Sequence, residues 1–128
     1  MKWSYKAKSY IYTISWSPDD RLLAAGSYNY FIYVFSTDGK LKWRYETDDI
    51  VYCVAWSPDG QLLAAGSWNY IYVFDRNGVL KWWYWAGGYI RSLSWNSDGQ
   101  LLAAGSWDNY VYVFNRTREL KWRYKTGG

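Results

Sequence analysis

The fold is decided by the stretch WSPDGQLLAAGS, which occupies residues 56–67. Its second half, LLAAGS, is found unchanged at three places, beginning at residues 22, 62 and 101, which are 40 and 39 residues apart. The tryptophan that opens the stretch keeps the same interval, at Trp16, Trp56 and Trp95. A period near 40 residues indicates a repeat architecture, built either from helical pairs or from propeller blades.

Strands account for this repeat better than helices do. Residues 71–74 and 111–114 are β-branched and aromatic runs of strand length. Residues 57–60, Ser-Pro-Asp-Gly, are typical of a tight turn, because Pro presets φ and Gly supplies a positive φ. Four antiparallel strands in about 40 residues have the size of one propeller blade. In the second unit these strands are predicted over residues 50–56, 61–67, 70–75 and 80–85.

The chain is therefore predicted to be one all-β repeat domain over residues 1–128, a β-propeller fragment of three four-stranded blades. The expected segments are an extra outer strand at residues 1–9 and blades at 10–49, 50–88 and 89–128. The extra strand is expected because residues 2–5, Lys-Trp-Ser-Tyr, match the fourth strands that begin at Lys42, Lys81 and Lys121.

The second unit resembles the WD-repeat propellers in residues 56–67 and again in Tyr72-Val73-Phe74-Asp75. The chain departs from that family in having no histidine, so the family's Asp-His-Ser-Trp hydrogen-bond network is absent. A second resemblance is to the quinoprotein-like repeats, in which a Gly-x-x-x-Trp spacing docks one blade on the next. Gly39 to Trp43 and Gly78 to Trp82 keep that spacing, whereas Arg118 breaks it in the third unit. This second resemblance implies a way of packing blades, not a catalytic activity.

Closure of the ring is expected to come from a second copy of the chain. Propellers usually have four to eight blades, so three blades leave two sheet faces exposed. A head-to-tail homo-oligomer would cover them. A dimer with six blades is favoured because six lies inside the usual range, and a trimer with nine is the alternative. The ring is closed by one of the two terminal outer strands, through Trp3 and Tyr5 or through Trp122 and Tyr124.

Composition excludes several chemistries. The chain has no histidine and a single cysteine, Cys53. Histidine relays, histidine-ligated metals, thiolate metal cages and internal disulfides are therefore impossible. Cys53 aligns with Thr13 and Ser92 and is interpreted as a packing residue. We predict no catalytic, cofactor-binding or metal-ligating residues, no cofactor, and no enzymatic activity.

The expected partners are further copies of the chain and other proteins. No stretch reaches the roughly 18 apolar residues of a membrane span, so no membrane interaction is expected. Lysine and arginine alternate with aromatic residues on the outer strands, a pattern that also suits nucleic-acid binding. The net charge of only +4 favours protection of an edge strand instead, and nucleic acid is not an expected partner. The expected location is the cytoplasm.

One rim of the ring is the candidate ligand surface. Aromatic rings that stack, beside amides and carboxylates that fix orientation, can recognise a sugar or a peptide. The same polar residues are also what tight turns require, and tryptophans there can simply cover a blade. Arg91 stands where Tyr12 and Tyr52 stand in the other units, near the axis. The loops expected at this rim bring together Tyr28, Asn29, Trp68, Asn69, Trp107, Asp108 and Asn109, with Arg91 and the acidic Asp48 and Asp49.

Three hypotheses of function follow. The first is a non-catalytic, self-assembling scaffold for protein interactions. The second is a symmetric array, recently amplified or engineered, without an evolved function, because more than half of the aligned positions in units two and three are identical. The third is binding of a small ligand or glycan at the rim of tryptophan and asparagine residues.

Overall fold

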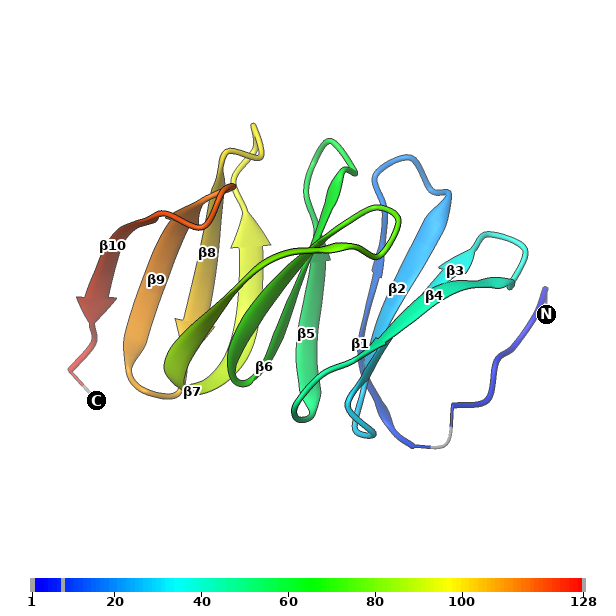
Figure 1. The fold of residues 1–128 in the computed structure, drawn as a ribbon, viewed down its shortest axis with the longest axis horizontal. Coiled ribbons are helices and arrows are strands. Elements are labelled where there is room, and N and C mark those ends of the chain that lie inside the picture. Colours follow the sequence, from blue (N-terminus) through cyan, green and yellow to red (C-terminus); the bar gives the residue numbers. More distant parts are fainter. Residues whose placement is uncertain (1, 8, 128) are drawn as a thin grey trace.

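A computed structural model of the chain describes residues 2–7 and 9–127 and contains only strands as regular elements in those ranges. The strands stand side by side in a curved row, with the two ends of the chain at opposite ends of the row (Figure 1). In chain order they are β1 (Ile11–Trp16), β2 (Leu22–Ser27), β3 (Phe31–Ser36), β4 (Leu41–Glu46), β5 (Val51–Trp56), β6 (Leu62–Asp75), β7 (Leu80–Trp95), β8 (Leu101–Ser106), β9 (Tyr110–Asn115) and β10 (Leu120–Lys125).

The pairing is antiparallel throughout and produces three blades. Blade 1 is the sheet β1-β2-β3-β4. Blade 2 contains β5, β6 and residues 80–85 of β7, and blade 3 contains residues 90–95 of β7 with β8, β9 and β10. Blades 2 and 3 form one hydrogen-bonded order from β5 to β10, because β7 runs on from the outer strand of blade 2 into the inner strand of blade 3. The predicted all-β propeller architecture is confirmed.

β6 is longer than expected because it includes a hairpin turn. The sequence predicts two strands, 61–67 and 70–75, and the structure joins them into one element from Leu62 to Asp75. Asn69 has a φ of +71° at the position where Tyr30 and Asn109 have φ values of +79° and +72° in the other blades. The three hairpins therefore reverse at equivalent residues, although the middle turn is one residue shorter.

The core lies between neighbouring blades. Small side chains from the LLAAGS strands, among them Ala24, Ala64 and Ala65, are fully or almost fully buried. They let the sheets approach closely, and larger residues of the adjacent blade fill the remaining space. Val51 and Leu63 belong to the cluster between blades 1 and 2, and Ile90 and Leu102 belong to the cluster between blades 2 and 3.

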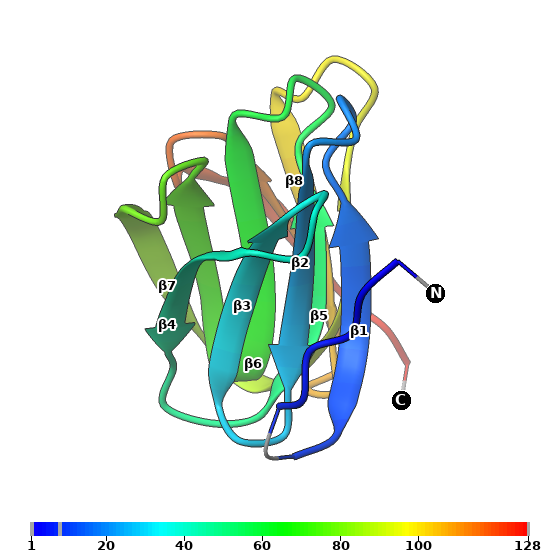
Figure 2. The same cartoon turned by 90° about the vertical axis from the view of Figure 1, so that its right-hand side faces the viewer.

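The N-terminal segment differs from the expectation. Residues 2–7 form no strand, and residues 1 and 8 of the predicted strand over 1–9 lie outside the described residues. Figure 2 shows the segment running over the face of blade 1. Trp3 lies there against Phe35. A strand needs the free edge of another strand to pair with, whereas a sheet face offers side-chain contacts only.

Replacing Gly66 by alanine is expected to destabilise the protein by about 1–3 kcal/mol through overpacking between blades 2 and 3. A Cβ atom at Gly66 would lie 2.6 Å from Cys53 Sγ and 2.6 Å from Ile90 Cγ2. Urea denaturation of the variant and the parent gives the difference in the free energy of unfolding. Gly127, whose Cβ would meet nothing within 4 Å, supplies the matched control Gly127→Ala. Equal stability of both variants would contradict the close packing at Gly66.

Candidate functional site

A row of aromatic rings crosses the three blades at the rim predicted from the sequence. Tyr12 of β1 lies 6.2 Å from Tyr28 and 5.8 Å from Tyr52 of β5, measured between ring centroids. Tyr52 in turn lies 5.3 Å from Tyr89 of β7, with the two rings edge to face. Tyr28 is therefore connected to the tryptophans of the rim through these tyrosines of the inner strands.

At the blade 3 end of this row, Tyr89 lies between two tryptophans. Its ring centroid is 4.4 Å from that of Trp68 and 4.8 Å from that of Trp107, and both tryptophans are exposed. Tyr89 was not among the predicted site residues. Its only sequence signal is that Tyr10 holds the same place in the first unit, whereas Ile50 holds it in the second.

Arg91 lies between two of these rings. Its guanidinium carbon is 5.0 Å from the ring centroid of Tyr52 and 4.8 Å from that of Trp107, a cation–π arrangement on both sides. Burial raises the pKa of Tyr52 above its ordinary value, so the ring beside Arg91 is a neutral phenol. Among the described residues no ion pair or side-chain hydrogen bond involves Arg91, so its N–H groups are available to a ligand.

The polar residues predicted at the rim mainly serve their own turns. Asp108 accepts hydrogen bonds from the Tyr112 hydroxyl and from the Gly87 and Tyr110 amides, the amides at 3.2 and 2.9 Å. Burial alone would raise the pKa of Asp108, but these hydrogen bonds lower it below the ordinary value. Asn29 donates to the hydroxyl oxygen of Tyr33 at 3.1 Å. Over the described residues, the rim is therefore an aromatic surface with Arg91 beside it, rather than a cluster of amides and carboxylates.

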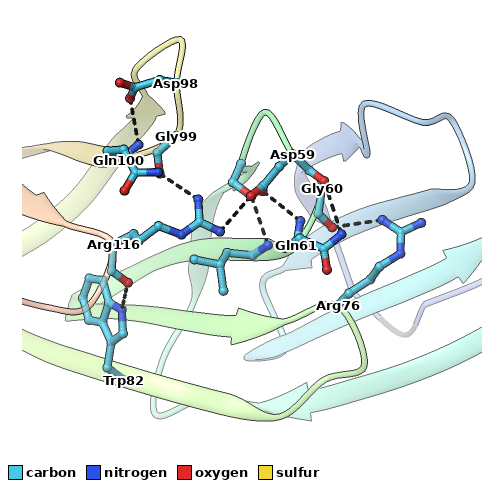
Figure 3. A network of polar contacts seen from close by, with 11 residues as sticks. Asp59, Gly60, Gln61, Arg76, Trp82, Asp98, Gly99, Gln100 and Arg116 are labelled. Atoms are coloured by element: carbon cyan, nitrogen blue, oxygen red, sulfur yellow. Dashed lines mark hydrogen bonds and ion pairs between the residues drawn. The ribbon is translucent and has the colours of Figure 1, made fainter.

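Figure 3 shows the polar network that joins neighbouring blades on another part of the molecule. The Arg116 guanidinium donates to the Gly99 carbonyl at 2.8 Å in its own blade and forms an ion pair with Asp59 of blade 2 at 3.0 Å. Arg76 repeats the arrangement one blade earlier, with Gly60 at 3.0 Å and with Asp19 of blade 1 at 2.7 Å. These arginines link blade 2 to blade 1 and blade 3 to blade 2.

Acid is expected to weaken this network. The Ser17 hydroxyl, 2.6 Å from the carboxylate, together with the Arg21 amide and Arg76, lowers the pKa of Asp19 to about 2 from an ordinary 3.8, against the opposing effect of burial. A depressed folded-state pKa contributes stability that is present above the unfolded value near 4 and is lost as the pH falls towards 2. The melting temperature should therefore be lower at pH 2 than at pH 5.

Two variants test the origin of that fall. Asp19→Asn should reduce the drop in melting temperature between pH 5 and pH 2, because one of the carboxylates that stabilise the folded state is gone. Asp98→Asn is the matched control, since Asp98 holds the same turn position in blade 3 and accepts only the Gln100 amide among the described residues. An equal effect of both substitutions would contradict the role of the Arg76–Asp19 pair.

Blade 1 and blade 3 each have a free face at one end of the row of blades. On these faces, residues are exposed whose equivalents in other blades are buried between blades. Trp56 is 8% exposed and donates to the Ser15 carbonyl of blade 1 at 3.1 Å, whereas the equivalent Trp16 is 48% exposed. At the other end every residue of β10 is exposed. Trp122 and Tyr124 on β10 are 52% and 66% exposed.

The remaining predictions concern metal ions and Cys53. Cys53 is buried, its Sγ donates to the Ile90 carbonyl at 3.4 Å, and burial raises its pKa to about 12. The thiol is therefore protonated and packed between blades 2 and 3. No group of three or more acidic or cysteine side chains that could hold a metal ion occurs in the ranges that the structure describes. Over the same ranges, no helix has the length and apolar character needed to cross a membrane.

Comparison with known proteins gives a consistent result. The family model "WD domain, G-beta repeat" matches residues 2–36, 39–75 and 84–115. A comparison with curated proteins finds no match. Among solved structures, Sqt1 of Chaetomium thermophilum, bound to the N-terminus of the ribosomal protein L10, has a TM-score of 0.84 at 22% identity, covering 91% of this chain and 34% of that one.

Two further structures agree with that likeness. U3-55K has a TM-score of 0.90 at 18% identity, covering 95% of this chain and 41% of its own. The WD40 repeats of RRP9 have a TM-score of 0.89 at 19% identity, covering 95% of this chain and 40% of their own. The chain thus spans about two fifths or less of the length of these neighbours, and the likeness concerns the fold.

Proposed function

The chain belongs to the WD40 repeat family, and on that premise we propose that it is a non-catalytic scaffold that assembles with itself and holds other proteins. Propellers of this family generally act as scaffolds for proteins rather than as enzymes. The observation that carries the proposal is the pair of exposed faces, in which Trp16 and Trp122 are 48% and 52% exposed, whereas their counterparts Trp56 and Trp82 are buried between blades. Exposed apolar surface of this kind marks an interaction site.

Self-association is tested by mass. Native mass spectrometry, checked by light scattering at micromolar protein concentration, should give twice the chain mass of 15.2 kDa for a six-blade ring, or three times that mass for a nine-blade ring. Trp16→Ala should shift the distribution towards the single chain because it removes a large side chain from the face to be covered. A stable monomer at all concentrations would contradict self-association.

The surface proposed for other proteins is the aromatic row around Tyr89, with Arg91 beside it. Tryptophan, tyrosine and arginine are the residues that contribute most to protein binding sites. The row runs across all three blades, which suits an extended peptide segment better than a compact ligand. Sqt1, a propeller of the same fold, is bound to the N-terminus of another protein, which supports a peptide segment as the ligand.

A display library of random peptides tests this surface. Peptides selected on the parent protein should lose roughly tenfold or more in affinity for Trp107→Ala and for Arg91→Ala, as expected for central contact residues. The matched control is Trp83→Ala, which removes another exposed tryptophan from the outer strand of blade 2, outside the row. Equal losses from Trp107→Ala and Trp83→Ala would contradict the assignment of the rim.

Glycan binding at the same rim is a second candidate, favoured by the exposed rings of Trp68 and Trp107 on either side of Tyr89. Aromatic rings stack on the apolar faces of sugars, so a glycan array measures this activity directly. Binding of glycans that is lost in Trp107→Ala, without selection of peptides, would favour this candidate. Binding of neither class would leave a self-assembling array without an evolved ligand.

A further inference from the structure

Trp3 makes the same hydrogen bond to blade 1 that other tryptophans make between blades. Trp43 on the outer strand of blade 1 donates to the Arg76 carbonyl of blade 2 at 3.1 Å. Trp82 on the outer strand of blade 2 donates to the Arg116 carbonyl of blade 3 at 3.0 Å. Trp3 donates at 2.8 Å to the carbonyl of Thr37, the residue of blade 1 that is equivalent to Arg76 and Arg116.

The ring packing of Trp3 repeats that of the two internal interfaces. The Trp3 and Phe35 rings are 5.6 Å apart at 42°. The corresponding pairs are Trp43 with Phe74, at 5.4 Å and 43°, and Trp82 with Phe114, at 5.6 Å and 45°.

The neighbouring tyrosine and glycine follow the same pattern. Tyr5 lies 4.9 Å from Phe35, and Tyr45 lies 4.8 Å from Phe74. A Cβ atom on Gly39 would lie 2.6 Å from Trp3, just as one on Gly78 would lie 2.7 Å from Trp43. Residues 2–6, here termed the N-terminal cap, therefore contact blade 1 as the outer strand of a preceding blade would.

The chain carries a second set of residues that fits the same site. Trp122 and Tyr124 are equivalent to Trp3 and Tyr5 by sequence, and they lie on β10, which is paired with β9 from Leu120 to Lys125. Both side chains are exposed. One site on blade 1, formed by Phe35, Gly39 and the Thr37 carbonyl, thus has two candidate occupants that exclude each other.

We propose that the N-terminal cap and β10 of a second copy compete for this site on blade 1. In the single chain the cap occupies the site. On assembly β10 of the second copy displaces the cap, inserts Trp122 and Tyr124 against Phe35, and covers Trp16 at the same time. The proposal rests on the self-association proposed above and adds that the chain limits its own assembly.

Strand pairing favours β10 over the cap at high concentration. β10 is already ordered by its ladder with β9, so its docking carries a smaller cost in backbone entropy than docking of residues 2–6, which have no ladder. The interface with a second copy nevertheless lacks a counterpart of the internal ion pairs, because Thr37 stands where Arg76 and Arg116 stand. Because it lacks these ion pairs, the contact between blade 1 and a second copy is weaker than the internal interfaces, and the intramolecular cap can compete with it.

Three variants test the competition by sedimentation equilibrium. Trp3→Ser with Tyr5→Ser removes the contacts of the cap. If the cap holds nine tenths of the sites, the apparent dissociation constant should fall roughly tenfold for each interface formed, which is roughly a hundredfold for a closed ring of two copies. Trp122→Ser with Tyr124→Ser should abolish association. Ser4→Ala, in the exposed centre of the cap, is the control and should behave as the parent does. Weaker association of the cap variant would overturn the proposal, because it would make the cap a contributor to the assembly.

A peptide of residues 117–126 separates failure of this proposal from failure of self-association. The labelled peptide should bind the cap variant, and a variant lacking residues 1–7, roughly tenfold more tightly than the parent. That result with all chains monomeric would contradict self-association and retain the competition for the site on blade 1. Equal binding to parent and cap variants, or binding to neither, would overturn the competition.

Discussion

Replacing Trp56 by alanine is expected to lower the free energy of unfolding by about 3–5 kcal/mol, as for other large buried aromatic side chains. Trp56 is 8% exposed and lies between blades 1 and 2. Its indole donates to the Ser15 carbonyl at 3.1 Å, and the Arg76 guanidinium lies 5.9 Å from the ring. The substitution therefore removes apolar contact, a hydrogen bond and a cation–π contact from one interface.

The repeat supplies its own control for this substitution. Trp16 holds the same position in blade 1 but is 48% exposed, so Trp16→Ala should change the stability of the monomer by no more than about 0.5 kcal/mol. Urea denaturation at a protein concentration below the onset of association measures both. Similar losses for the two variants would show that Trp16 is covered in the single chain, contrary to the structure.

Replacing Phe74 by alanine is expected to cost a similar amount, about 3–5 kcal/mol, because it leaves a cavity under the outer strand of blade 1. Phe74 is fully buried, and the rings of Trp43 and Tyr45 on β4 lie 5.4 and 4.8 Å from it. Both tyrosine and tryptophan fluorescence should change, because Trp43 and Tyr45 lose their contact with the Phe74 ring. Unfolding in urea gives the magnitude, and β4 should be the first element to lose protection in hydrogen exchange.

Val79→Ala provides the reference for Phe74→Ala, since Val79 lies in the following turn and is 57% exposed. The substitution should change the free energy of unfolding by no more than about 0.5 kcal/mol. A loss below about 1 kcal/mol for Phe74→Ala would mean that the blades do not depend on this contact, against the expectation for a core aromatic residue.

The blades themselves could be predicted because their signals are local. Each LLAAGS run places small residues on a strand, and the turns before the second and third runs have glycine where φ is positive, at Gly60 with φ +71° and Gly99 with φ +72°. The Gly-x-x-x-Trp spacing also indicated docking between blades, and Trp43 indeed lies against Gly78 of the next blade. The merging of strands into β6 and β7 was not predicted, because continuity through a turn depends on small differences in backbone geometry.

The candidate rim could be predicted only in part. Trp68 and Trp107 do meet, on either side of Tyr89, and Arg91 lies over the Trp107 ring. Tyr89 was missed because its partners lie far along the chain. The asparagines and Asp108 were offered as ligand contacts, whereas Asn29 and Asp108 bond within their own hairpins. Asparagine and aspartate side chains both stabilise turns and bind ligands, so the sequence alone does not tell which of the two roles a given residue has.

Two segments of the chain carry the same outer-strand motif but differ in secondary structure. Residues 2–5 and 121–124 share the pattern Lys-Trp-x-Tyr, and by itself this pattern determined which groups are offered for docking, an indole and a phenol. In residues 2–5 these groups lie against Phe35 and Gly39. Only the tertiary structure decided that residues 121–124 form a strand and residues 2–5 do not. The physical reason is that β-structure needs the backbone edge of another strand, which β9 supplies to one copy and the face of blade 1 does not supply to the other.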